Sequence, residues 1–447
     1  MAYKLTCCAI QSMALATLIA VRPTAAVDGD NGENTLEFNA LCRLLRAAQA
    51  GLQESSDTLP AGIEKTFNDI AMAAKLAYTN TTAMGTELKA LQEDKKKWPQ
   101  YLPDTPSTDR TKRAINHTYL LAEKIRSAAN TDIENHKISI AEANKLLGEA
   151  VSGKKVFPPN YNDDGNFLTA ATSADVFGPM AGTAKNCGGT GGGSGNGNNV
   201  GRTLVNDIVC LCCVTASGSK KLCGKKTGSA NQASPGYDNP GSSIKAAFAG
   251  VMALCPKRQT RTTTAELQAL LAAVENLIGR QAGEATTADD NAAYILGLAD
   301  NQATGCTGAD KQVCVNYKLQ LAGSSATGIP WRNKIQEAIT KAGSDSTLRT
   351  KLAQAESTLE HINNTMWQAY DTAFVAAECK QQKPKKTCEE KGCKWNGTQT
   401  DGTCEAKERE EQANTAGTGD GAAAGCARHQ NQPDCANDKT GEKQNCA

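Results

Sequence analysis

Two long stretches of the chain carry residues spaced alternately four and three apart, most of them apolar. The first stretch reads Ile63, Phe67, Ile70, Ala74, Ala77, Thr81, Met84, Leu88 and Leu91, and the second reads Leu348, Leu352, Ala355, Leu359, Ile362, Met366, Ala369, Ala373 and Ala376. This spacing places each set on one face of an α-helix, as in a coiled coil. The pattern predicts a first helix from Ala61 to Trp98 and a second helix through the later stretch. Because an isolated amphipathic helix would leave its apolar stripe in water, we expect the two helices to pack together.

Three further apolar seams predict additional helices. They lie between Asn34 and Leu52, between Ile115 and Val151, and between Thr264 and Leu298. Their apolar positions are Leu36, Leu41, Leu44, Leu45 and Ala48 in the first, Leu121, Ile125, Ile133, Ile140 and Leu147 in the second, and Leu267, Leu270, Leu271, Val274, Leu277 and Ile278 in the third. The sequence therefore predicts a mainly α protein built as an elongated antiparallel coiled-coil helical bundle.

The helical pattern is interrupted between residues 153 and 260, where a glycine tract from Gly188 to Gly201 and several cysteines occur. This composition is typical of loops rather than of long helices. We interpret the stretch as an irregular, disulfide-tied head region inserted into the bundle, and we expect a second head insertion at residues 300–330. The helical N-terminal domain would then span residues 27–378.

The first residues of the chain, 1–26, have the layout of a secretory signal peptide. A basic start at Lys4 precedes an apolar run over residues 5–21 and a small-residue end. The run is short for a membrane span and is interrupted by polar residues, so a membrane anchor is the less favoured alternative. We expect cleavage before Val27, which would send the mature chain into an oxidising compartment where thiols pair.

Cysteines are frequent, with 18 in the chain, of which Cys7 and Cys8 lie in the expected signal peptide. In an oxidising compartment the others should form disulfides rather than zinc or redox sites. Cys306 and Cys314 lie close enough in sequence to close one short loop, whereas the other pairings stay open. Nine cysteines lie from Cys42 to Cys314, an odd number, so at least one must be free or must pair outside this group.

The composition changes sharply after Cys379, where Lys and Glu dominate and apolar residues nearly vanish. We expect a cysteine-rich module at 379–404, a flexible linker at 405–425 and an incomplete second module at 426–447. With so few apolar side chains, such small modules depend on disulfides. The disulfide candidates of the first module are Cys379, Cys388, Cys393 and Cys404. The second module contains three cysteines where the first has four, so we expect that the sequence stops short of the natural C-terminus.

Composition and motifs argue against several functions. The 48 Lys and Arg residues balance 47 Asp and Glu residues, which leaves no basic surface for nucleic acid. The 4 histidines provide little material for a metal centre or a catalytic relay. The glycine tract lacks the spacing of a phosphate-binding loop, and no G-x-S-x-G or H-E-x-x-H motif occurs. We interpret Asp163 and Asp164 as solvated charges and the C-x-x-C spacing of Cys210 and Cys213 as part of the disulfide framework, and we expect no enzymatic activity, metal or cofactor.

Four N-x-[ST] sequons are candidate N-glycosylation sites in a chain that passes through the secretory pathway. They are Asn80, Asn116, Asn363 and Asn396. Asn396 falls on a loop of the cysteine-rich module, whereas Asn80 adjoins a seam position and its exposure depends on the rotation of the helix. We favour Asn363 and Asn396 over Asn116, and Asn116 over Asn80.

The C-terminal motifs resemble the cysteine-rich domain of trypanosome variant surface glycoproteins. The segment CEEKGCKWNGTQTDGTCEAKE runs from Cys388 to Glu408, with Cys379 upstream, and CANDKTGEKQNCA resembles the start of a second such subdomain. Further toward the N-terminus, the resemblance rests on a signal peptide, an LCRLL segment at Leu41, two long heptad helices and a GIPW motif at Gly328. Together these features cover nearly the full chain.

The resemblance implies a coat glycoprotein that forms a homodimer or homotrimer on the extracellular face of the parasite plasma membrane, held there by a glycosylphosphatidylinositol (GPI) anchor. Such proteins shield the membrane and evade host antibodies by antigenic variation. No small-residue cleavage site with an apolar tail follows Cys446, so the anchor is expected from the family alone. Some relatives carry an O-linked sugar on a head loop, which makes Ser324 and Ser325 candidates here.

Two alternatives to a coat antigen remain at the level of sequence. A ligand-binding surface receptor could use the same helical scaffold, since it would differ in its surface between helices rather than in a motif. A secreted enzyme would need a concave pocket with a strongly perturbed acid or base.

Overall fold

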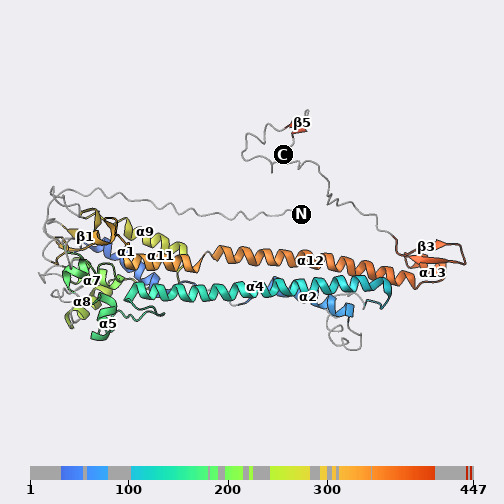
Figure 1. Ribbon diagram of the computed structural model, residues 1–447, viewed down its shortest axis with the longest axis horizontal. Coiled ribbons are helices and arrows are strands. Elements are labelled where there is room, and N and C mark those ends of the chain that lie inside the picture. Colours follow the sequence, from blue (N-terminus) through green and yellow to red (C-terminus); the bar gives the residue numbers. More distant parts are fainter. Residues whose placement is uncertain are drawn as a thin grey trace, which may run out of the picture. The chain divides into compact units, whose positions relative to one another are not determined.

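The computed structural model describes residues 32–53, 58–78, 102–179, 182–189, 197–214, 221–224, 242–281, 292–299, 305–308, 312–343, 345–407, 439–440 and 443–444. Most of these residues are helical (Figure 1). The chain divides into two compact units, the first formed by residues 1–69 and 120–363 and the second by 70–119 and 364–447. The expected mainly α architecture is confirmed.

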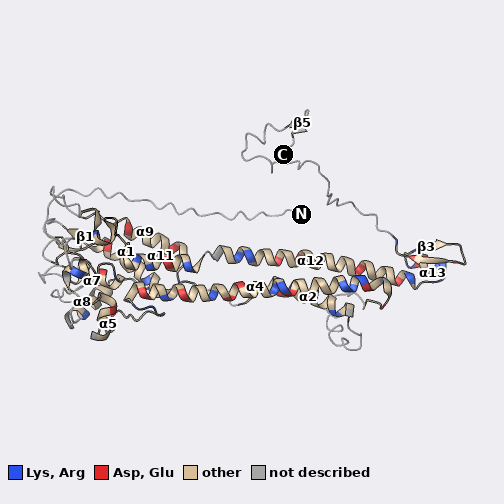
Figure 2. Cartoon of the chain, viewed as in Figure 1, with Lys and Arg blue, Asp and Glu red and all other residues tan. Residues whose placement is uncertain are grey.

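Three long helices contact one another in the first unit. They are α2 (Ala61–Tyr78), α4 (Pro106–Ser152) and α12 (Asp345–Lys380), each of which continues into the second unit. Arg126 on α4 pairs with Glu64 on α2 at 2.8 Å, and Lys351 on α12 pairs with Asp132 on α4 at 2.7 Å. Figure 2 shows basic and acidic residues interspersed along α4 and α12. Charges of both signs are therefore distributed along these two helices.

The seam of α4 differs from the expected one near residue 121. Ile115, Ala122 and Ala129 are buried at intervals of one heptad, whereas the side chain of Leu121 is 41% exposed. The prediction for Leu121 is wrong. Position 122 belongs to the buried heptad series, and the side chain of Leu121 points about 100° away from it around the helix axis. Leu36 on α1 (Thr35–Ala50) is likewise exposed, although it was expected in a seam.

Helix α2 begins at Ala61, as the pattern predicts, and its described part ends at Tyr78. The backbone N–H of Leu102 donates to the carbonyl of Leu76 at 3.4 Å, so the chain returns to this helix just before α4. The remainder of the expected helix, including Asn80, lies outside the described residues.

The core of the head surrounds α7 (Leu204–Cys212), whose nine residues are all buried. It packs against α1, α5 (Ala170–Phe177), α6 (Thr183–Cys187) and α8 (Ser242–Met252). Helix α9 (Thr264–Glu275) contacts both α1 and α11 (Pro330–Ala342), which begins within the GIPW motif.

The predicted helix from Thr264 to Leu298 is wrong in its second half. Gly279, with φ +83°, follows α9, and a short 3-10 helix (Ala292–Tyr294) leads into strand β1 (Ile295–Ala299). This strand pairs antiparallel with β2 (Gln312–Asn316). The apolar helical spacing stops at Ile278, and glycine accommodates the positive φ that ends the helical region. The continuous apolar run of β1 fits a strand buried on both faces.

The fully buried Asn34 side chain ties this hairpin to the helices. Its amide donates to the carbonyls of Leu211 at 2.9 Å and Val313 at 2.8 Å, and its oxygen accepts from the N–H of Leu298 at 2.8 Å. One side chain thus satisfies backbone groups of α7, β2 and β1.

Three small elements lie between residues 381 and 407, directly after α12. They are α13 (Lys385–Glu390), β3 (Lys394–Gly397) and β4 (Gly402–Glu405), and the two strands form an antiparallel hairpin. A further pair of short strands, β5 (Lys439–Thr440) and β6 (Lys443–Gln444), also runs antiparallel. Among the described helices, none combines the length and the apolar character needed to cross a bilayer.

Candidate functional site

Helix α1 is fixed to the rest of the head by a disulfide and an ion pair one turn apart. Cys42 bonds to Cys255, and the guanidinium of Arg46 donates to both carboxylate oxygens of Asp163, at 2.7 and 2.9 Å. The Arg46 side chain is 6% exposed and that of Asp163 is 34% exposed. Tyr161 also donates to Asp163, at 3.0 Å. Asp163 is therefore a paired structural carboxylate, and its interpretation as a solvated charge is wrong.

The electrostatics of this cluster follow from burial and pairing. Burial alone would raise the pKa of Asp163, but hydrogen bonds from Arg46 and Tyr161 outweigh it and hold the pKa below its usual value. Burial, reinforced by the Asp163 charge, raises the pKa of Tyr161. The tyrosine hydroxyl therefore stays a donor and Asp163 stays ionised at neutral pH.

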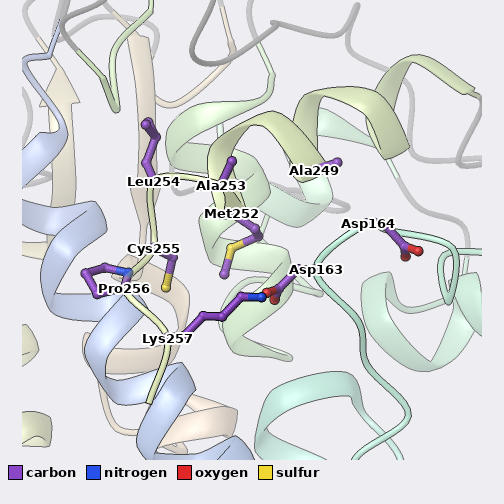
Figure 3. A pocket seen from close by; sticks show the side chains of 9 residues that line it. All are labelled: Asp163, Asp164, Ala249, Met252, Ala253, Leu254, Cys255, Pro256 and Lys257. Carbon is purple, nitrogen blue, oxygen red and sulfur yellow. The ribbon is translucent and has the colours of Figure 1, made fainter. Parts of the chain in front are cut away.

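A surface groove of about 560 Å³ lies beside this cluster (Figure 3). Met252, Leu254 and Cys255 supply its apolar lining, and in Figure 3 the Lys257 amine points toward the Asp163 carboxylate. Cys255 is in a disulfide, and the lining residues contain no nucleophile paired with a base. The groove can contact a ligand through apolar atoms and a mixed-charge rim, but its residues do not assemble a catalytic group.

A second buried cluster surrounds Asp207 on α7. Its Oδ2 accepts from the hydroxyl of Tyr317 at 2.6 Å and from the indole N–H of Trp331 at 2.7 Å. Its Oδ1 accepts from the Asn206 amide at 2.9 Å and from the N–H of Gly201 at 3.1 Å. Burial raises the pKa of Asp207 to about 6, although all four donors act to lower it. This carboxylate joins α7, the end of β2 and the start of α11.

Six disulfides connect the described cysteines. They are Cys42–Cys255, Cys187–Cys210, Cys212–Cys223, Cys306–Cys314, Cys379–Cys393 and Cys388–Cys404. Among the cysteines that the structure describes, Cys213 alone has no disulfide partner, and burial raises the pKa of its thiol. The C-x-x-C spacing therefore does not form a redox pair, since Cys210 bonds to Cys187 instead.

The sequons that the structure describes lie in three different environments. Asn116 is exposed on α4 and Asn396 is exposed on β3. Asn363 is half-buried on α12, and its Oδ1 atom is buried without a hydrogen-bond partner among the described residues. The structure thus makes Asn116 and Asn396 more accessible than Asn363.

Ser324 and Ser325 lie on an exposed loop after the short helix α10 (Lys318–Leu321). The loop is anchored at Gln320, whose side chain donates to the carbonyl of Gly197 at 2.7 Å and whose carbonyl accepts from the N–H of Gly328 at 2.9 Å. Both serines are therefore exposed to solvent on a loop whose two ends are held by hydrogen bonds of Gln320.

The sequence interpretation missed the Asp207 and Arg46 clusters. The signal for Asp207 is present in LVNDIVCLC, where the polar pair Asn206 and Asp207, with the helix's single charge, interrupts a run of apolar residues. A charge at such a position must be buried with partners or must disrupt the helix. No local signal identifies Tyr317 and Trp331 as its partners, because they are more than a hundred residues away in the chain.

The described residues thus form a disulfide-stapled, mainly helical protein with a cysteine-rich C-terminal module. Two family models match this chain. The "Trypanosomal VSG domain" matches residues 16–361, and the "Trypanosome variant surface glycoprotein C-terminal domain" matches residues 379–447. The chain belongs to the variant surface glycoprotein family of trypanosomes, and the resemblance noted in its motifs is confirmed.

Curated relatives agree with this assignment. The chain is 28% identical to variant surface glycoprotein YnAT 1.1 of Trypanosoma congolense, over 79% of this chain and 82% of that protein. It is 26% identical to YnAT 1.3 of the same species, over 69% and 73% of the two chains. It is 24% identical to ILTAT 1.25 of Trypanosoma brucei brucei, over 90% and 85%. The family consists of structural surface coat proteins rather than enzymes, and this chain is a surface coat antigen of that family.

Proposed function

We propose that this protein is a glycosylated, GPI-anchored coat antigen that shields the parasite plasma membrane and evades host antibodies by antigenic variation. The observation that carries the proposal is that both the N-terminal and the C-terminal family models match, at residues 16–361 and 379–447. In this proposal the protein works on the extracellular face of the membrane as a homodimer or homotrimer, with host antibodies as the partners it must escape.

The low identity to relatives supports a role in antigenic variation. The chain shares 28% and 26% of aligned residues with two proteins of the same family. A buried core must keep its volume and its apolar pattern, whereas exposed positions change at little cost in folding stability. The family can therefore replace the exposed residues that antibodies contact while the buried residues maintain the fold.

N-glycans would add to the shielding by covering protein surface. We propose Asn396 and Asn116 as the most accessible acceptors, since both are exposed. Asn363 is the less accessible acceptor, because it is half-buried on α12. Asn80 remains a candidate outside the described residues, and Ser324 and Ser325 are the candidate O-glycosylation sites on their exposed loop.

Intact mass spectrometry of the protein from the parasite surface tests the modifications. The mass should fall after enzymatic removal of N-glycans, and phospholipase C should release the protein from the membrane. Sedimentation analysis of the released protein should give a dimer or a trimer. A protein that resists phospholipase C, or one that sediments as a monomer, would contradict the corresponding part of the proposal.

Surface abundance separates a coat antigen from a ligand-binding receptor on the same scaffold. Quantitative surface proteomics should find this chain as the dominant surface species of the cells that express it, spread over the whole membrane. A scarce product confined to one region of the membrane would instead indicate the receptor.

A further inference from the structure

The sequon of Asn396 lies inside the β3–β4 hairpin of the first cysteine-rich module. Its three residues, Asn396, Gly397 and Thr398, form the end of β3 and the start of the turn. In the antiparallel register Asn396 is paired with Thr403, and Gly397 is paired with Gly402. Asn396 is exposed in this arrangement. The closed hairpin therefore leaves room for a glycan on Asn396.

The turn uses all the polar groups of Thr398, the third residue of the sequon. Its hydroxyl donates to the carbonyl of Asp401 at 3.0 Å and accepts from the N–H of Asp401 at 3.1 Å. Its own N–H donates to the same carbonyl at 2.7 Å, and its carbonyl accepts from the indole N–H of Trp395 at 2.6 Å. A hydroxyl at this position defines an N-x-[ST] sequon. In the closed hairpin that hydroxyl is engaged within the chain.

Glycan transfer requires the sequon to leave the hairpin. In the reaction a bond forms between Nδ2 of Asn396 and C1 of the first sugar, while the bond from C1 to a lipid-linked diphosphate breaks. The amide loses one proton, and the lipid diphosphate departs. A transferase that recognises the sequon must reach the Thr398 hydroxyl and the backbone around it, and β4 already covers one edge of that backbone. The closed hairpin can thus hold a glycan, but its geometry opposes accepting one.

The Cys388–Cys404 disulfide is the main restraint that keeps the hairpin closed. It joins α13 to β4, so the loop that it closes contains Asn396. A two-stranded hairpin alone is at best marginally stable in water, and the buried cluster of this module consists of its half-cystines. Hairpins open and close within microseconds, whereas disulfides take seconds or longer to form. The sequon is therefore accessible until the disulfide forms.

We propose that glycan transfer to Asn396 competes with formation of the Cys388–Cys404 disulfide, and that the first of the two events decides whether the chain carries this glycan. The inference rests on the proposed glycosylation of Asn396 and adds its regulation. At ordinary rates of translation Cys404 is synthesised within about a second of Asn396, so both events become possible almost together. A chain that oxidises first stays unmodified at Asn396, and the coat contains both forms.

The occupancy of Asn396 in the full-length chain, expressed in trypanosomes, tests this competition. Mass spectrometry of the tryptic peptide that contains Asn396, prepared from whole cells, measures occupancy whether or not a variant is exported. The unaltered chain should have a measurable unglycosylated fraction. In Cys388→Ser/Cys404→Ser this fraction should fall at least about threefold, because the hairpin stays open. The control Cys306→Ser/Cys314→Ser removes a disulfide of the head and should leave the fraction unchanged.

A second pair of variants keeps every cysteine and so separates the hairpin from the general effects of losing a disulfide. A Cβ atom at Gly402 would lie 2.7 Å from the carbonyl oxygen of Asn396. Gly402→Val should therefore hold the hairpin open and lower the unglycosylated fraction as the cysteine variant does. Thr403→Val is the matched control, since Thr403 is exposed and valine suits a strand, and it should leave the occupancy unchanged.

The outcomes distinguish the competition from the glycosylation on which it rests. Asn116, on α4, serves as the reference in every sample, because none of the variants lies on that helix. Equal occupancy of Asn396 in the unaltered chain, Cys388→Ser/Cys404→Ser and Gly402→Val, including complete occupancy in all three, would overturn the competition and leave the glycosylation intact. Absence of the glycan from Asn396 in all three would overturn both.

Discussion

The head and the first cysteine-rich module both contain disulfides, but what is buried around those disulfides differs. In the head, four disulfides accompany a large core of aliphatic and aromatic side chains around α7. In the module, the buried cluster consists of the four half-cystines themselves. The same covalent bond therefore adds to an existing core in one region and replaces a core in the other. The contribution of a disulfide can be judged only with its surroundings.

The largest difference should appear when one disulfide is removed from each region. In Cys388→Ser/Cys404→Ser we expect the hairpin of the module to lose its protection against amide hydrogen exchange, since losing a native disulfide costs about 2–5 kcal/mol in a small domain. In Cys306→Ser/Cys314→Ser the β1–β2 hairpin should keep measurable protection, because the head core still buries it. Equal loss of protection in the two hairpins would remove the distinction.

The pH dependence of the free energy of unfolding should show how much the buried charge of Asp207 destabilises the head. The pKa of Asp207 is about 6 in the folded chain and about 4 when unfolded, so the folded state binds this proton more tightly. Its contribution to stability therefore falls as pH rises from about 4 to about 6, by up to about 3 kcal/mol, and is constant above that range. Urea unfolding at several pH values should show this loss in the unaltered chain relative to Asp207→Asn.

The carboxylate of Asp163 supplies a control of opposite sign for this titration. Its pKa is lowered in the folded chain, so its stabilising contribution is present above about pH 4 and is lost as pH falls through the folded pKa. Relative to Asp163→Asn, the unaltered chain should therefore lose stability on acidification. If the free energy of unfolding changed with pH in the same way for the unaltered chain and for Asp207→Asn, the assignment of the Asp207 charge would be contradicted.

A smaller effect is expected from the ion pair that holds α1 to the head. Arg46→Ala leaves the Asp163 carboxylate without its buried partner and should cost about 2–3 kcal/mol, below the full buried-pair value because Asp163 is 34% exposed. Arg126→Ala is the matched control, since both partners of its pair with Glu64 are more than a third exposed, and its cost should be at most about 1 kcal/mol. Urea unfolding measures both, and a similar cost for the two variants would contradict the prediction.

A further comparison concerns one hydrogen bond in each region. Trp395→Phe removes the bond from the indole N–H to the carbonyl of Thr398, at 2.6 Å near the surface of the module, and should cost about 1 kcal/mol. Trp331→Phe removes the bond to the buried carboxylate of Asp207 in the head and should cost about 1.5–3 kcal/mol. Amide hydrogen exchange, measured on peptides from each region of the folded protein, gives the free-energy costs of the two substitutions. A larger cost in the module would show that its side-chain hydrogen bonds carry more of its stability than its small core suggests.

The long helices could be predicted from the sequence because their heptad spacing is a local property. Ala61 begins α2 as expected, and the later seam lies within α12. The choice between Leu121 and Ala122 could not be made by hydrophobicity, since the larger side chain is the exposed one. The buried position is decided by the distance between packed helices, where alanine allows close approach.

Contacts between distant segments could not be predicted. Cys42 pairs with Cys255 across 213 residues. The odd count of cysteines predicted that at least one would be free or would pair outside the group, but it did not identify Cys213 as that residue. The β1–β2 pairing was missed because its apolar run is equally compatible with a buried helix. The ion pair of Asp163 was missed because its partner, Arg46, lies on a helix more than a hundred residues earlier in the chain.

The position of Cys213 has a consequence for how the native disulfides form and persist. Cys210, Cys212 and Cys213 sit together at the end of α7, and successive side chains on a helix point about 100° apart. In the folded chain Cys210 bonds to Cys187 and Cys212 bonds to Cys223, whereas the buried thiol of Cys213 has no disulfide partner. Burial keeps that third thiol protonated and inaccessible, so it cannot attack the neighbouring disulfides. Burial of Cys213 in the core therefore protects the two disulfides of α7 from exchange with its thiol.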